Sequence, residues 1–193
     1  MLFNSYIFVF LFFPVSLSGY WLCVKAAEKK ERSFLTSLFL VAASLLFYGY
    51  LKPAYLPVLL VSLLVNFAFY RQIEKRKEKK AFLAGGIFLD LLVLGIFKYT
   101  GSTFVPLGIS FFTFSQIAFL VEGYRGSLKR TSLLDYSVYL TFFPKIMEGP
   151  IALPTDFLSA YQESGKKGFS IENLYRGLIP VSYTHLRAHE TRS

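Results

Sequence analysis

The chain has 193 residues, of which 54% are apolar, 19% aromatic and only 17% charged, and its mean hydropathy is +0.47. Soluble domains carry about 25% charged residues, so this composition excludes an ordinary soluble domain. The formal net charge of +9 does not indicate nucleic-acid binding, because the basic residues fall in short clusters between long apolar segments. The single cysteine, Cys23, excludes an internal disulfide and a cysteine-based metal site.

Five apolar segments follow one another along the chain, each about the length that a transmembrane helix needs. The predicted spans are Met1–Val24, Ser33–Leu51, Ala54–Tyr70, Ala81–Phe97 and Phe104–Val121. The first segment has neither the basic start nor the cleavage site of a signal peptide, so we interpret it as a membrane helix. Pro106 is expected in the first turn of the fifth helix, where proline is favoured.

The charged loops predict an orientation for these spans. Basic residues dominate the loops Lys25–Arg32, Arg71–Lys80 and Glu122–Arg130, whereas the loops after the second and fourth spans carry a single Lys each. Lys and Arg accumulate in cytoplasmic loops. We therefore expect a multi-pass protein of the bilayer with its N-terminus outside and these three loops in the cytoplasm.

The pattern changes after Tyr136. The apolar run Tyr136–Phe143 meets the Pro- and Gly-containing segment Pro144–Pro150, and a second apolar patch follows at Ile151–Leu153. Irregular backbone at membrane depth survives only where protein or a water-filled cavity satisfies its polar groups. We predict a re-entrant or broken helix, with two short interfacial segments as the alternative. Asp156–Arg176 predicts an amphipathic helix on the cytoplasmic face, so the fold class is an all-α polytopic membrane protein.

One carboxylate lies inside a predicted span. Asp90 is near the middle of the fourth span, where an ionised carboxylate without a partner costs on the order of 3 kcal/mol. A polar group is therefore expected to face it. This contact could serve helix packing or belong to a functional polar pathway.

Five further residues are candidates for substrate binding. Ser110 and Gln116 lie on the otherwise apolar fifth span, where they could either pack helices together or line a substrate path. Lys145 and Glu148 flank the predicted break and could pair or face a polar entrance. Arg125, at the cytoplasmic end of the fifth span, is either an interfacial anchor or a ligand contact.

Catalytic side chains are not evident. The two histidines, His185 and His189, both lie in the last thirteen residues, so the preceding chain offers no histidine as a general base. It also shows no nucleophile–base pair and no cluster of metal ligands. The sequence leaves the catalytic residues unassigned and predicts no metal.

Two motifs resemble a known family. PLGISFFTFSQIAFLVEGYRG at Pro106–Gly126 and YLTFFPKIMEGPI at Tyr139–Ile151 resemble the membrane-bound O-acyltransferases, within them the branch of the alginate O-acetyltransferases and of the teichoic acid D-alanyl transferase. The resemblance covers nearly all of Met1–Pro180 and includes LGIFKYTGS at Leu94–Ser102. Tyr124–Gly126 is more similar to the polysaccharide O-acetyltransferases than to the D-alanyl transferase.

This resemblance implies a function in the bacterial inner membrane. Such proteins carry an acyl group, here expected to be acetyl, from a cytoplasmic thioester donor such as acetyl-CoA or an acyl carrier to hydroxyls of an exported or cell-surface polysaccharide. No bound cofactor is implied; the acceptor polymer and an extracytoplasmic partner acetyltransferase are implied partners. An intramembrane histidine is the expected base, and nothing in Met1–Pro180 matches its motif. We therefore expect a truncated N-terminal part of the enzyme, inactive alone, with Lys145, Glu148 and Arg125 near the donor entrance.

Three alternatives stay open: D-alanyl transfer to teichoic acid, a non-catalytic membrane scaffold or transport component, and an inactive truncation without a role of its own. The C-terminal residues bear on this choice. VSYTHLRAHET at Val181–Thr191 resembles the conceptual translation of a transposon-end sequencing adapter. We therefore divide the chain into residues 1–180, the acyltransferase part, and a non-native tail at 181–193. His185 and His189 in that tail are not assigned to a metal or catalytic site despite their i, i+4 spacing.

Overall fold

The computed structural model describes residues 8–26, 34–76, 78–99, 105–106, 108–128, 130–146 and 152–164. Over these ranges the chain is helical and contains no strand, which confirms the predicted all-α class. The predictions for Glu148, for residues 165–176 and for the tail at 181–193 lie outside the described residues.

Helices of very different length make up the fold. The elements in chain order are η1 (Phe8–Phe12), α1 (Phe13–Ala26), α2 (Phe34–Leu51), η2 (Pro53–Tyr55), α3 (Leu56–Lys75), α4 (Lys79–Tyr99), α5 (Ile109–Arg125), α6 (Leu133–Thr141), α7 (Phe143–Ile146) and α8 (Pro154–Ser164). The first of them, η1, is π-helical, and η2 is a single 3₁₀ turn. Three helices are long and apolar enough to cross a membrane: Phe34–Leu51, Pro53–Lys75 and Lys79–Tyr99. The apolar stretch of α1 and the 17-residue helix α5 are shorter.

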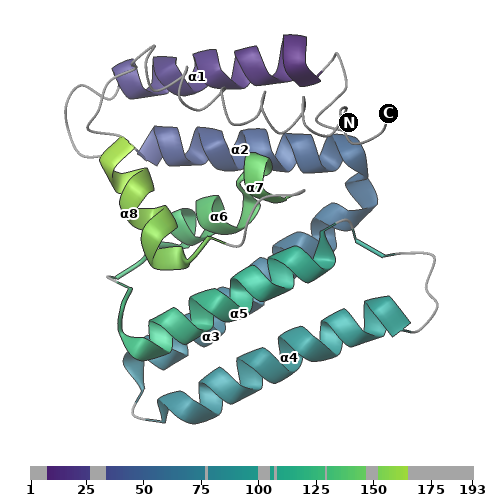
Figure 1. Ribbon diagram of the computed structural model, residues 1–193, viewed down its shortest axis with the longest axis vertical. Coiled ribbons are helices and arrows are strands. Elements are labelled where there is room, and N and C mark those ends of the chain that lie inside the picture. Colours follow the sequence, from purple (N-terminus) through teal and green to yellow (C-terminus); the bar gives the residue numbers. More distant parts are fainter. Residues whose placement is uncertain are drawn as a thin grey trace, which may run out of the picture.

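The helices form two packed groups with three short helices between them (Figure 1). α3, α4 and α5 pack on one another, and α1 packs on α2. α6, α7 and α8 lie between α2 and α5, so that α6 contacts helices of both groups. The predicted break in the chain thus lies in the interior of the bundle.

Most helix ends differ by a few residues from the predicted boundaries, and two of the differences have a clear physical reason. α3 continues to Lys75 instead of ending at Tyr70, because Ile73 is fully buried and Arg71 pairs with Glu74 one turn on. α5 begins only at Ile109, after Gly108 in the left-handed conformation with φ of 71°. The prediction that Pro106 occupies the first helical turn is therefore wrong; its carbonyl accepts a hydrogen bond from the Ile109 N–H in the turn before the helix.

A glycine allows α5 to approach α3 closely. A Cβ atom on Gly123 would lie 2.8 Å from Cδ2 of the Tyr70 ring, whereas a Cβ atom on Gly95, in α4, would meet nothing within 4 Å. An aromatic ring cannot bend away as a flexible chain end can. Gly123 therefore sets the distance between the two helices at this level.

Gly123→Ala is expected to lower the free energy of unfolding by about 1–3 kcal/mol, because the methyl group forces the Tyr70 ring out of its place. Gly95→Ala is the matched control and should raise stability by about 0.5–1 kcal/mol, the usual gain in a helix interior. Thermal unfolding in detergent, followed by circular dichroism, measures both. Equal stability of the two variants would contradict the close approach.

Candidate functional site: a re-entrant hairpin around Lys145

α6 runs back along α5 from the end where α5 stops. Near its start, the Thr131 N–H donates to the Tyr70 hydroxyl on the neighbouring α3 at 3.4 Å. Further along, the rings of Tyr136 and Phe119 are 4.5 Å apart, and the Tyr139 hydroxyl donates to the Ser115 carbonyl at 3.4 Å. The direction of α6 is thus antiparallel to α5.

Proline ends α6 inside the bundle. Pro144 has no N–H to donate to the carbonyl four residues before it, and its ring would clash with that carbonyl. The helix accordingly stops at Thr141, Phe142 leaves the helical conformation with ψ of 108°, and the short helix α7 follows. The Phe143 N–H, freed by the break, donates to the Ser44 hydroxyl on α2 at 3.2 Å. This contact fixes the turn of the hairpin against the middle of α2.

The chain then returns to the end from which it came. Ala152 lies again beside Tyr139, whose hydroxyl donates to the Ala152 carbonyl at 3.2 Å. At the end of α8, the Tyr161 hydroxyl donates to Ser37 in the first turn of α2 at 3.0 Å. α8 lines a cavity of about 150 Å³ together with Asp135 of α6 and the segment between α5 and α6. Among the described residues, the chain thus enters and leaves this hairpin on the same side, as the re-entrant form of the prediction requires.

Tyr139 is the residue that joins both arms of this hairpin to α5. Tyr139→Phe removes its hydroxyl bonds to Ser115 and Ala152, and we expect a loss of about 1 kcal/mol. Hydrogen–deuterium exchange should become faster over 152–164 and stay unchanged in α3. The control is Tyr99→Phe, at an exposed position; the same exchange pattern in both variants would contradict the role of Tyr139.

Lys145, at the turn of the hairpin, is a buried cation among aromatic rings. Its side chain is 6% exposed, and its Nζ lies 3.6 Å from the ring centroid of Tyr139, 5.4 Å from that of Phe157 and 5.8 Å from that of Phe111. It donates one hydrogen bond, to the Tyr139 carbonyl at 3.4 Å. None of the ion pairs among the described residues includes it.

Rings stabilise an ammonium group without neutralising it. A cation held at such a position, with donor capacity left over, can bind an anionic group or a negative charge that develops during a reaction. Charged side chains of this kind inside a membrane bundle are usually functional. Lys145 therefore stays a candidate for substrate binding.

The polar group expected to face Asp90 is Asn66 of α3. Its Nδ2 donates to Asp90 Oδ1 at 2.6 Å, and both residues are at most 4% exposed. One turn earlier, the Ser62 hydroxyl donates to Gln116 Oε1 at 3.0 Å, and the Tyr136 phenol lies beside the amide of Gln116 and the carboxyl group of Asp90. Sequence reasoning missed Asn66, although an amide near the middle of an apolar span was a visible signal.

The structure separates the predicted substrate-binding residues. Gln116 is buried and turned toward α3, which favours its packing role, and Ser110 is half-buried in the first turn of α5. Arg125 is exposed at the other end of α5, where it pairs with Glu122 at 3.2 Å. It follows Phe111, the neighbour of Lys145, by 14 residues, about 21 Å of helix. Lys145 and Arg125 therefore lie near opposite ends of α5, whereas both were expected near one donor entrance.

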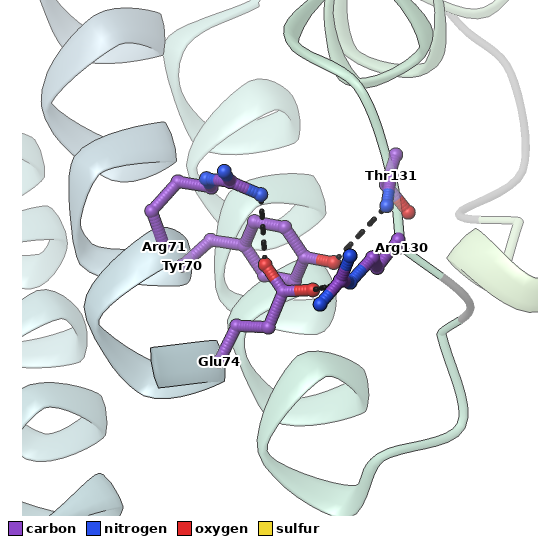
Figure 2. Close-up of polar contacts among 5 residues, drawn as sticks. All are labelled: Tyr70, Arg71, Glu74, Arg130 and Thr131. Carbon is purple, nitrogen blue, oxygen red and sulfur yellow. Dashed lines mark hydrogen bonds and ion pairs between the residues drawn. The ribbon is translucent and has the colours of Figure 1, made fainter. Parts of the chain in front are cut away.

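The second and third basic loops meet at one end of the bundle. Figure 2 shows Glu74, in the last turn of α3, between Arg71 at 2.8 Å and Arg130 at 3.8 Å. The bond from Thr131 to Tyr70 lies beside this pair of contacts. The α3–α4 turn and the segment after α5 are thus on the same side, as the charge pattern predicts.

The chain is similar in sequence to several known proteins. No family model and no solved structure matches it. The chain is 26% identical to the peptidoglycan O-acetyltransferase of Helicobacter pylori, over 94% of its own length and 42% of that protein. It is 27% identical to the probable alginate O-acetylase of Pseudomonas aeruginosa, over 83% of its length and 34% of that protein. The chain is a homologue of the membrane-bound O-acyltransferases.

A third member of this family, the teichoic acid D-alanyltransferase of Lacticaseibacillus rhamnosus, is 30% identical over 56% of the chain and 29% of its own length. The chain spans less than half the length of all three O-acyltransferases. Within the described residues no three His, Cys, Asp or Glu side chains form a metal-binding group, and none of those residues is a histidine. The resemblance predicted from the two motifs is confirmed, and the catalytic base stays unassigned.

Proposed function

We propose that the chain supplies part of an enzyme that transfers an acyl group, acetyl in the first instance, from a cytoplasmic thioester to hydroxyl groups of an exported or cell-surface polysaccharide. Homology to two O-acetyltransferases of bacterial polysaccharides supports this reaction. The observation that carries the proposal is the burial of Lys145 at the turn of a re-entrant hairpin. No bound cofactor takes part, since the thioester itself, acetyl-CoA or an acyl carrier, brings the activated acyl group.

Acyl transfer is faster when a positive group lies near the thioester carbonyl. When a hydroxyl attacks the thioester carbonyl, negative charge develops on the carbonyl oxygen. The Lys145 ammonium, held by three rings and one carbonyl, can stabilise that charge in a site of low dielectric constant. In this proposal Arg125, at the other end of α5 from Phe111, meets a more distant anionic part of the donor.

The experiment is performed on a complete acyltransferase that carries this segment, expressed in bacteria that lack their own enzyme. Mild alkaline treatment of the polysaccharide releases ester-linked groups, which are then identified. Acetate that depends on expression supports the proposal. If expression adds no ester-linked group while the protein reaches the membrane, the proposal is wrong.

D-alanyl transfer to teichoic acid is the second candidate, favoured by the D-alanyltransferase among the relatives. The same alkaline treatment distinguishes it, because D-alanine appears in place of acetate. Transfer of either group uses a thioester and a hydroxyl, so the role proposed for Lys145 is common to both.

The location and partners belong to the same proposal. We place the protein in the inner membrane with the N-terminus outside and the basic α3–α4 turn in the cytoplasm, because Lys and Arg are retained on that side. The acceptor polymer, through an extracytoplasmic acetyltransferase, is the proposed partner. Reporter fusions after Lys52 and after Arg76 test the orientation: activity of a periplasmic reporter only at Lys52 agrees with it, and the reverse pattern overturns it.

A further inference from the structure

The turn between α3 and α4 carries more positive charge than its own carboxylates neutralise. The segment Arg71–Lys80 contains six basic and two acidic residues. Of the two carboxylates, Glu74 is already shared between Arg71 and Arg130. Glu78 forms none of the ion pairs among the described residues.

Arg76, Lys79 and Lys80 are all exposed and lie within one short stretch at this turn; we call these three residues the turn cluster. The guanidinium of Arg76 is held in place: its Nε donates to Gln72 Oε1 at 3.0 Å, and its Cζ lies 5.7 Å from the ring centroid of Phe82 in the first turn of α4. The two terminal nitrogens of Arg76 stay available for an anion. A guanidinium ordered in this way loses less entropy when it binds a phosphate group.

An apolar surface continues directly from this cluster. α4 has the lowest buried share of the three long helices, 11%, and its exposed residues include Phe88, Leu91, Leu92 and Ile96. A ligand that lies on both surfaces must combine an anionic head with long apolar chains.

We propose that the turn cluster and the exposed face of α4 bind an anionic phospholipid, with its phosphate on Arg76, Lys79 and Lys80 and its acyl chains along α4. Basic residues at the membrane surface attract anionic lipid by about 1 kcal/mol each, which corresponds to about fivefold in affinity. This site takes no part in the acyl transfer proposed above and does not depend on it.

The test measures lipid binding to the purified chain in detergent by native mass spectrometry. Phosphatidylglycerol and phosphatidylcholine with the same acyl chains are compared, so only the headgroup differs. We expect phosphatidylglycerol to bind at least tenfold more tightly. Lys79→Gln/Lys80→Gln should weaken its binding about 25-fold, the product of two fivefold losses.

The matched control is Lys52→Gln/Lys98→Gln, which removes the same charge at the opposite ends of α3 and α4 and should change the affinity less than twofold. All four lysines are exposed, so circular dichroism should show unchanged folding. Equal binding of the two lipids by the original chain would overturn the proposal, and so would an equal loss in both double variants. Displacement of phosphatidylglycerol by excess inorganic phosphate would instead assign the site to free phosphate, and the proposal of a lipid site would be wrong.

Discussion

Lys145→Met is expected to abolish acyl transfer and leave the protein at least as stable as before. Methionine fills a similar volume among the rings of Tyr139, Phe157 and Phe111, which surround the Lys145 ammonium group, but it carries no charge. Loss of one group that stabilises developing negative charge lowers kcat about 100- to 1000-fold. Lys145 forms no ion pair among the described residues. Its replacement by an apolar side chain therefore also removes a cost of desolvation, so the free energy of unfolding should stay equal or rise by about 1 kcal/mol.

Two measurements on a complete acyltransferase that carries this segment check this prediction: ester-linked acetate on the polysaccharide and thermal unfolding of the purified protein. Lys145→Arg keeps the charge and should retain part of the activity. Lys52→Met is the control for a lysine at an exposed position and should have no effect. A Lys145→Met protein that is folded and fully active would end the proposed role, whereas one that is inactive and unfolded would show that the lysine is structural.

The second large effect concerns the contact between Asn66 and Asp90. Asn66→Leu leaves the Asp90 carboxyl group buried without its 2.6 Å donor, and we expect a loss of about 2–4 kcal/mol. Asp90→Leu should cost less, about 1–2 kcal/mol, because the Asn66 amide keeps its bond to the Ser62 carbonyl at 3.3 Å. Both changes are measured as the free energy of unfolding of the purified chain in mixed micelles.

The double variant Asn66→Leu/Asp90→Leu removes both partners together, and a pair of apolar side chains then lies between α3 and α4. We expect the double variant to be more stable than Asn66→Leu, with a coupling of about 1–2 kcal/mol. Asp90→Asn is the conservative control, since its amide oxygen can still accept from Asn66. Strict additivity of the two single changes would contradict a direct contact.

The sequence predicted part of the functional region because some of its causes are local. The Pro- and Gly-containing segment Pro144–Pro150 predicted that the apolar run from Tyr136 would break. In the structure α6 ends at Thr141 and the chain turns there. The Phe143 N–H donates to Ser44 in the middle of α2, which favours the broken helix over the alternative of two interfacial segments.

Other features depended on neighbours that no local pattern identifies. Asp90 predicted that a polar group would face it, but its partner is 24 residues away in the sequence. Which residue faces Asp90 depends on how α3 and α4 are rotated about their axes. The rings around Lys145 come from α5, α6 and α8. That Lys145 lies beside Phe111, about 21 Å of helix before Arg125, likewise appears only when the hairpin is placed along α5.

By itself, the sequence determined that this is an all-α membrane protein with apolar helices, basic turns on one side and a broken helix near Pro144. Hydropathy, charge and proline act within a few residues, so these properties can be read locally. The tertiary structure alone decided which polar side chains meet, because that depends on the depth and rotation of each helix. Close packing fixes both, as where Gly123 admits the Tyr70 ring.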